Sequence, residues 1–123
     1  MELKQYIDPI QCYCALNEVS YPILNSISKH KKTCFAHTSN VVKVGLQLFI
    51  PIEYKSWNNQ HKTPTILARN LYCVVHKLSG NVILESISQT AKLARQSVDM
   101  FTSLRYKVIK CEIILLTQQQ HLN

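Results

Sequence analysis

The chain has 123 residues, with 14 Lys and Arg against 7 Asp and Glu, 5 Cys and only 2 Gly. This length suits a single domain. A hydrophobic share of 46% is enough to bury a core, which excludes a chain that is disordered throughout. The two glycines and the 17% of charged residues exclude a collagen-like chain and a coiled coil.

The positive charge is concentrated in the second part of the chain. Residues 1–40 carry four basic and three acidic side chains, whereas residues 41–123 carry ten and four. A formal net charge of +7 favours a polyanionic partner: nucleic acid, anionic lipid or an acidic protein. We therefore expect any polyanion site to lie within residues 41–123.

The first residues contain no apolar run of the kind that an export signal has. The apolar stretch of residues 113–116 is far too short to span a bilayer, so we expect no membrane insertion. The five cysteines are irregularly spaced, and without an export signal they are expected to be reduced thiols. These features predict an intracellular protein of the cytoplasm or nucleus.

In chain order, alternation predicts a first strand over 10–16, and Pro22 precedes a short helix. A second strand is expected over 41–52, where Gly45 marks a bulge or a close backbone approach. Thr63 and Pro64 fit the start of a helix whose buried stripe includes Leu67, Leu71 and Leu78 and whose C-terminal glycine is Gly80.

A short strand follows over 81–85, and Ser86 with Gln89 fits a capping box that opens a second helix reaching Phe101. The last strand is expected over 106–117, before a flexible tail of residues 118–123. The fold class predicted is α/β, with α+β as the alternative. It is a small two-layer sandwich with β-α-β-α-β order from residue 41 and parallel neighbouring strands. The chain forms one domain, residues 1–123, in which an N-terminal strand-plus-helix arm, residues 1–40, precedes the core of residues 41–117.

A basic surface with an aromatic residue is the main candidate site. Lysines and arginines can grip phosphates, and an exposed aromatic ring can stack on a base. The predicted nucleic-acid-binding residues are Lys62, Lys92, Arg95, Arg105, Lys107, Lys110 and Trp57. The alternative is that these charges form a solvated face and that Trp57 packs over the sheet edge.

Two other constellations carry less specific signals. Cys12, Cys14, Cys34 and His37 have the ligand types of a structural zinc site, but the strand alternation already explains the first two cysteines as one buried face. We therefore expect no metal and no cofactor. Cys73 and His76 fall three residues apart in the expected first helix, a spacing that is structural far more often than catalytic.

The sequence thus predicts a small non-catalytic protein that binds nucleic acid, RNA rather than DNA. The alternative is an accessory protein that acts through protein–protein contacts, including a homodimer formed through an edge strand, which the apolar last strand suggests. A third hypothesis is that the chain comes from a short or recently arisen open reading frame with little selected function.

Overall fold

The structure, a computed structural model, describes residues 9–49 and 65–116. Within these ranges it contains five strands, two short α-helices and one turn of 3₁₀ helix. In chain order they are β1 (Ile10–Ala15), η2 (Leu24–Ser26), α1 (Lys31–Cys34), β2 (Val41–Leu48), β3 (Ile66–His76), β4 (Val82–Ser88), α3 (Ala91–Gln96) and β5 (Tyr106–Leu115).

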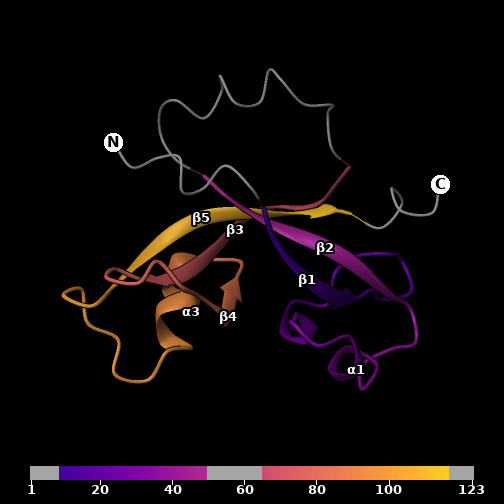
Figure 1. Cartoon of the computed structure of the whole chain (residues 1–123), viewed down its shortest axis with the longest axis horizontal. Helices are drawn as coiled ribbons and strands as arrows, with labels where there is room; N and C mark the ends of the chain where they lie inside the picture. The colour runs from indigo at the N-terminus through magenta and orange to yellow at the C-terminus, as the bar shows by residue number, and fades with distance from the viewer. Residues whose placement is uncertain (1–8, 50–64, 117–123) are drawn as a thin grey trace.

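The five strands form one curled antiparallel sheet in the order β1-β2-β5-β3-β4 (Figure 1). β1 pairs with β2, β3 pairs with β4, and β5 lies between the two pairs. The predicted α/β sandwich with β-α-β-α-β order is therefore wrong, because every neighbouring pair is antiparallel and the region expected to form the first helix is a strand. β1, from the segment expected to be an arm, is part of the same sheet.

The segment predicted as the first helix forms β3, the longest strand described. The register between β3 and β5 shifts between Ala68 and Leu71. There, two residues of β3 lie opposite a single residue of β5. The extra residue places the buried Ala68 and Leu71 three positions apart, before the two-residue alternation resumes at Cys73 and Val75. The bulge therefore interrupts the regular strand alternation, and the spacing of Leu67, Leu71 and Leu78 fitted a helix instead.

The second predicted helix is shorter than expected, and its capping residue is a different one. α3 begins after Thr90, whose hydroxyl accepts a hydrogen bond from the Leu93 N–H at 3.1 Å. Ser86 instead lies in β4, where its hydroxyl accepts from the Val74 N–H at 2.7 Å. Gly80 has the expected positive φ of 79°, but it lies in the turn between β3 and β4 rather than after a helix.

The strands predicted over 10–16 and 41–52 are confirmed as β1 and β2, with β2 described up to Leu48. Those over 81–85 and 106–117 correspond to β4 and β5. Gly45 is a close-approach glycine: a Cβ there would lie 2.8 Å from the Pro9 Cβ, closer than real Cβ contacts allow. The predicted helix start at Thr63 and Pro64 and the predicted tail lie outside the described residues.

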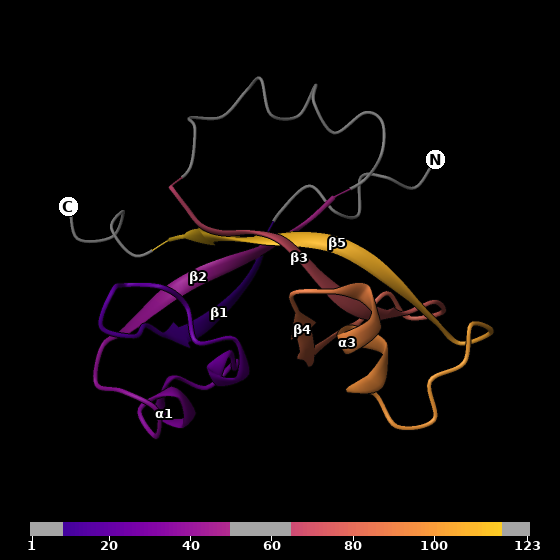
Figure 2. The same ribbon diagram turned by 180° about the vertical axis from the view of Figure 1, so that it is seen from behind.

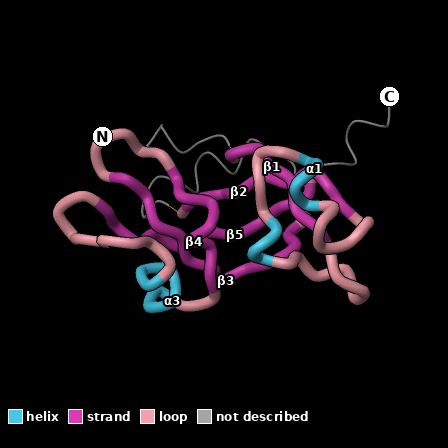
Figure 3. The backbone as a smooth tube through the Cα atoms, turned by 90° about the horizontal axis from the view of Figure 1, so that it is seen from below, coloured by secondary structure: helices cyan, strands magenta, loops and turns pink. Residues whose placement is uncertain are grey.

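The core fills the inner face of the curled sheet. It combines Val44, Leu46, Leu71 and Ile113 with side chains from the other strands and with Ile27, which follows η2. The η2 turn contacts both β1 and β4, so it bridges the two edges that the curl brings toward each other (Figure 3). α3 packs against the opposite, outer face of β3 and β4. There it covers Val74, which is fully buried although both of its neighbours in β3 point into the core.

Two buried serines supply hydrogen bonds that a strand backbone would otherwise provide. The Ser26 hydroxyl accepts from the Ala15 N–H at 2.8 Å on the free side of β1 and donates to the Ile23 carbonyl at 2.7 Å. The Ser86 hydroxyl accepts from Val74 in β3 and donates to the Ile83 carbonyl at 2.6 Å. Within the described residues no buried side-chain nitrogen or oxygen is left without a hydrogen-bond partner.

Candidate nucleic-acid interface

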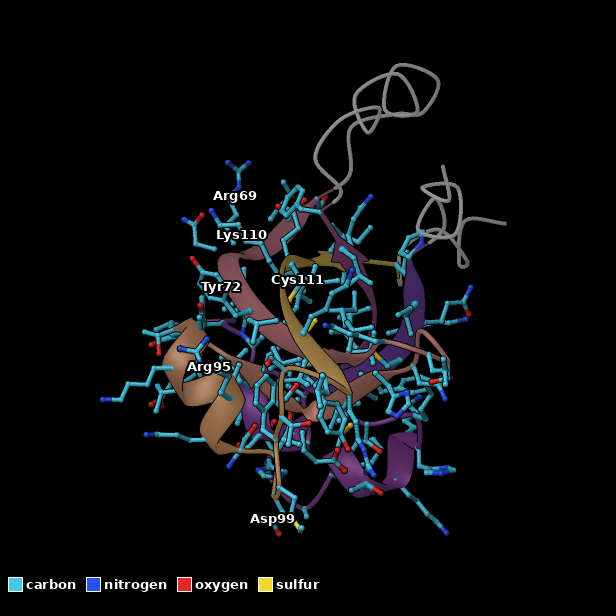
Figure 4. All side chains as sticks on the ribbon, turned by 90° about the vertical axis from the view of Figure 1, so that its left-hand side faces the viewer. Arg69, Tyr72, Arg95, Asp99, Lys110 and Cys111 are labelled. Atoms are coloured by element: carbon cyan, nitrogen blue, oxygen red, sulfur yellow. The ribbon has the colours of Figure 1, made fainter. Side chains whose placement is uncertain are left out.

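Cations and one tyrosine gather on the outer face of β3 and β5 and on the adjoining α3. We call this surface the outer basic face, and it consists of Arg69, Tyr72, Lys92, Arg95 and Lys110. Tyr72 is half-buried, and the four cations are exposed. Figure 4 shows Arg69, Lys110, Tyr72 and Arg95 following one another along the same side of the molecule.

Arg69 owes its position to the bulge in β3. Asn70, the next residue, has a φ of 57°, a left-handed conformation that asparagine tolerates better than most residues. The register leaves Arg69 and Asn70 opposite Glu112 of β5, between the pairs Leu71–Cys111 and Ala68–Ile113. The bulge thus presents an arginine to solvent from an otherwise apolar strand.

Tyr72 and Lys110 are direct cross-strand partners on the same face. Side chains in this relation have Cβ atoms roughly 5 Å apart. The ammonium of Lys110 can therefore contact a ligand that stacks on the Tyr72 ring. On its other side, Tyr72 pairs with Ser88 of β4, a small neutral residue. The ring therefore has a cation on one flank and no charged cross-strand partner on the other.

Lys92 and Arg95 come from α3, whose inward residue is the fully buried Ala94. Both cations are exposed, as predicted from the expected apolar stripe of this helix. Asp99 follows the end of α3. In Figure 4 it lies at the far end of the molecule from Arg69 and Lys110.

The structure does not bring all the predicted site residues together. Lys107 is the cross-strand partner of the core residue Val75, so strand alternation places it on the inner face, opposite to Lys110. Arg105 lies in the loop before β5. Lys62 and Trp57 lie outside the described residues.

Sequence reasoning missed Arg69 and Tyr72, because it placed them on a helix, whereas the pairing of β3 with β5 is what brings them beside Lys110. The available signal was the polar pair Arg69-Asn70 inside the run from Ile66 to Val75, which is rich in β-branched and aromatic residues. Asparagine within such a run marks a strand bulge more readily than a helix interior.

Within the described residues, the register places the carboxylate of Glu112 beside the outer basic face. Burial raises the pKa of its carboxyl above the ordinary value of 4.5, and the nearby Arg69 guanidinium partly lowers it again. The folded protein therefore holds this proton more tightly than the unfolded chain. The resulting stabilisation is complete below pH 4.5 and is lost as the pH rises through the folded pKa.

The substitution Glu112→Gln removes this titration while keeping the shape of the side chain. We expect the variant to be more stable than the parent at pH 7 and the advantage to disappear below about pH 4.5. Urea unfolding at several pH values measures the difference. Glu18→Gln, at an exposed residue on the α1 side of the molecule, is the control. An advantage that stays constant with pH would contradict this account of Glu112.

The structure does not bring the cysteines and histidine of the zinc hypothesis together as a cluster of metal ligands. Cys12, Cys14 and Cys34 are buried, whereas His37 is exposed. Burial raises the pKa of Cys12 to about 12, and the Cys34 thiol donates to the Ser26 carbonyl at 3.2 Å. Zinc binds thiolates, and within residues 9–49 and 65–116 no cluster of three or more ligand side chains could hold a metal ion.

Cys73 and His76 do not form a catalytic pair either. They lie three residues apart on a strand, so they point to opposite faces of the sheet. The Cys73 thiol lies in the core. Its hydrogen bond with the Cys111 thiol, together with burial, raises the pKa of Cys111. The His76 ring packs edge-to-face against Tyr106 with ring centroids 5.4 Å apart.

The apolar last strand is not an edge. β5 lies between β2 and β3, so the observation that suggested an edge-strand homodimer does not apply to it. On the free side of β1, Tyr13 exchanges backbone hydrogen bonds with Ser28, and β4 carries an irregular register between its two ends. Neither edge therefore offers a long flat template for another strand.

In the described part of the chain, no helix is both long and apolar enough to cross a membrane. Comparison with known proteins adds no functional information: no protein-family model, no curated protein and no solved structure matches the chain.

Proposed function

We propose that this protein binds single-stranded RNA, without catalysis, through the outer basic face. The observation that carries the proposal is Tyr72, with Lys110 as its cross-strand partner and Arg69 presented by the adjacent bulge. Arg95 of α3 extends the same side of the molecule. A face of this kind offers a stacking surface for a base and several contacts for phosphates.

The arrangement favours an unpaired strand over a duplex. The flat side of a base inside a duplex is already stacked on its neighbours, so only an unpaired base can lie on a tyrosine ring. Base–aromatic stacking contributes about 1–3 kcal/mol per base and is tolerant of sequence. An RNA partner would place the protein in the cytoplasm or nucleus, where its five thiols would stay reduced.

The test is fluorescence anisotropy of a labelled single-stranded RNA titrated with the protein between about 50 and 200 mM salt. The double variant Arg69→Gln/Lys110→Gln removes two phosphate contacts. Because each contact with a single strand contributes about 0.7 to the slope of log K against log salt, we expect the slope to become shallower by about 1.4.

The matched control is Lys31→Gln/Lys32→Gln, which removes the same charge from α1 on the other side of the molecule. This control should keep the slope of the parent. An equal reduction of the slope in both variants would mean that the protein binds RNA through its net charge alone, and the assignment of the outer basic face would fail. Duplex DNA of the same length, bound as tightly, would also contradict the proposal.

A further inference from the structure

Three of the most exposed apolar side chains in the described chain lie in two loops at one end of the sheet. They are Leu78 in the turn between β3 and β4, and Met100 and Leu104 in the segment between α3 and β5. Their exposed fractions are 87%, 85% and 87%. Figure 2 shows both loops beyond α3, at the end of the molecule away from α1. We call these three residues the loop tip.

The two loops are fastened to each other. The register that pairs His76 with Tyr106 continues one step, because the Lys77 N–H donates to the Arg105 carbonyl at 2.8 Å. The Lys77 ammonium also donates to the Ser103 carbonyl at 2.6 Å. Leu78 and Leu104 are the next residues along these two fastened segments.

The segment that carries Met100 is anchored immediately beside it. The Phe101 ring stacks on Tyr106 with ring centroids 5.7 Å apart, and Tyr106 in turn contacts His76. Met100 itself has a φ of 59° and points away from this aromatic group into solvent. The chain therefore leaves Phe101 half-buried and exposes Met100 directly before it.

The charges around the loop tip are mainly positive. Lys77, Arg105 and Lys107 are exposed, and Asp99 is the one carboxylate in the two loops. This arrangement matches the surface of an anionic bilayer. The cations can contact the headgroups, and the protruding apolar side chains can reach the acyl chains beneath them. A second copy of the chain would bring the same cations and a net charge of +7, which disfavours self-association through this end.

We propose that the loop tip inserts shallowly into the surface of anionic lipid membranes, with Lys77, Arg105 and Lys107 against the headgroups. Such a contact needs no membrane-spanning segment. It goes beyond RNA binding and uses none of the residues of the outer basic face, so either proposal can fail without the other.

Co-sedimentation with vesicles of 70% phosphatidylcholine and 30% phosphatidylserine tests this inference. We expect Leu78→Ser/Leu104→Ser to weaken binding roughly tenfold while leaving the charge and the RNA affinity unchanged. The matched control is Val19→Ser, at an apolar residue that is 76% exposed on the α1 side, and it should bind like the parent. Arg105→Gln and Lys107→Gln should each weaken binding about fivefold.

Insertion itself is read from a dye that responds to polarity. All five native cysteines are buried, so a cysteine introduced by Leu104→Cys can be labelled selectively. We expect a blue shift on binding anionic vesicles, and none for the same label at Ser39→Cys.

Two results would overturn the proposal. In the first, the vesicles bind but the label on Leu104→Cys does not shift, which would mean adsorption by charge alone. In the second, the parent forms a dimer that Leu78→Ser/Leu104→Ser converts to a monomer, which would identify the loop tip as an interface between copies.

Discussion

Replacing either Ser26 or Ser86 by alanine is expected to lower the free energy of unfolding by about 2 kcal/mol. Each hydroxyl is buried and accepts a hydrogen bond from a strand N–H, that of Ala15 for Ser26 and that of Val74 for Ser86. Alanine would leave that donor buried without a partner, which costs more than the net contribution of an ordinary hydrogen bond. Urea unfolding of the purified variants measures the loss.

Ser97→Ala is the control for both serines. The Ser97 hydroxyl also donates to a backbone carbonyl, that of Ala94 at 2.7 Å, but the residue is exposed. Its loss is expected to change the free energy of unfolding by no more than about 0.5 kcal/mol. If Ser26→Ala and Ser86→Ala cost no more than this control, the hydroxyls would not be the partners on which the two strands depend.

Replacing Tyr72 by leucine is expected to weaken RNA binding tenfold to a hundredfold. Leucine keeps apolar bulk on the outer face of β3 but lacks the flat ring, and one base–aromatic stack contributes about 1–3 kcal/mol. Tyr72→Phe keeps the ring and should bind nearly as tightly as the parent. The measurement is the anisotropy titration at one fixed salt concentration, together with an unfolding curve for each variant.

The salt dependence separates this effect from that of the cations. Tyr72→Leu should lower the affinity while leaving the slope of log K against log salt unchanged, because no phosphate contact is lost. A Tyr72→Phe variant as weak as Tyr72→Leu would contradict stacking and would assign the effect to the hydroxyl instead.

The strands that alternate regularly could be predicted from the sequence, and those with bulges could not. β2 has an apolar residue at every second position from Val42 to Leu48, and its prediction was confirmed. In β3 the bulge at Arg69 and Asn70 breaks that alternation, and the spacing of Leu67, Leu71 and Leu78 led to the prediction of a helix. A bulge depends on the register with β5, about 40 residues further along the chain, which no local pattern contains.

The error over β3 also determined how much of the candidate site could be predicted. Lys92, Arg95 and Lys110 were identified from the charge pattern and are exposed on the outer basic face. Arg69 and Tyr72 were missed because only the pairing of β3 with β5, together with the bulge, brings them beside Lys110. Lys107 was grouped with Lys110 although the two residues, three apart on β5, point to opposite sides of the sheet.

The position of β5 has a consequence for how the chain folds during synthesis. The β1–β2 and β3–β4 pairs leave the ribosome first, and each then has a free inner edge that only β5 can satisfy. Until residue 115 has emerged, β5 cannot join the two strand pairs, and isolated pairs of strands are marginal in water. The assembled sheet therefore forms after translation of its last strand, and a ribosome that stalls before Tyr106 leaves two unpaired edges open to aggregation.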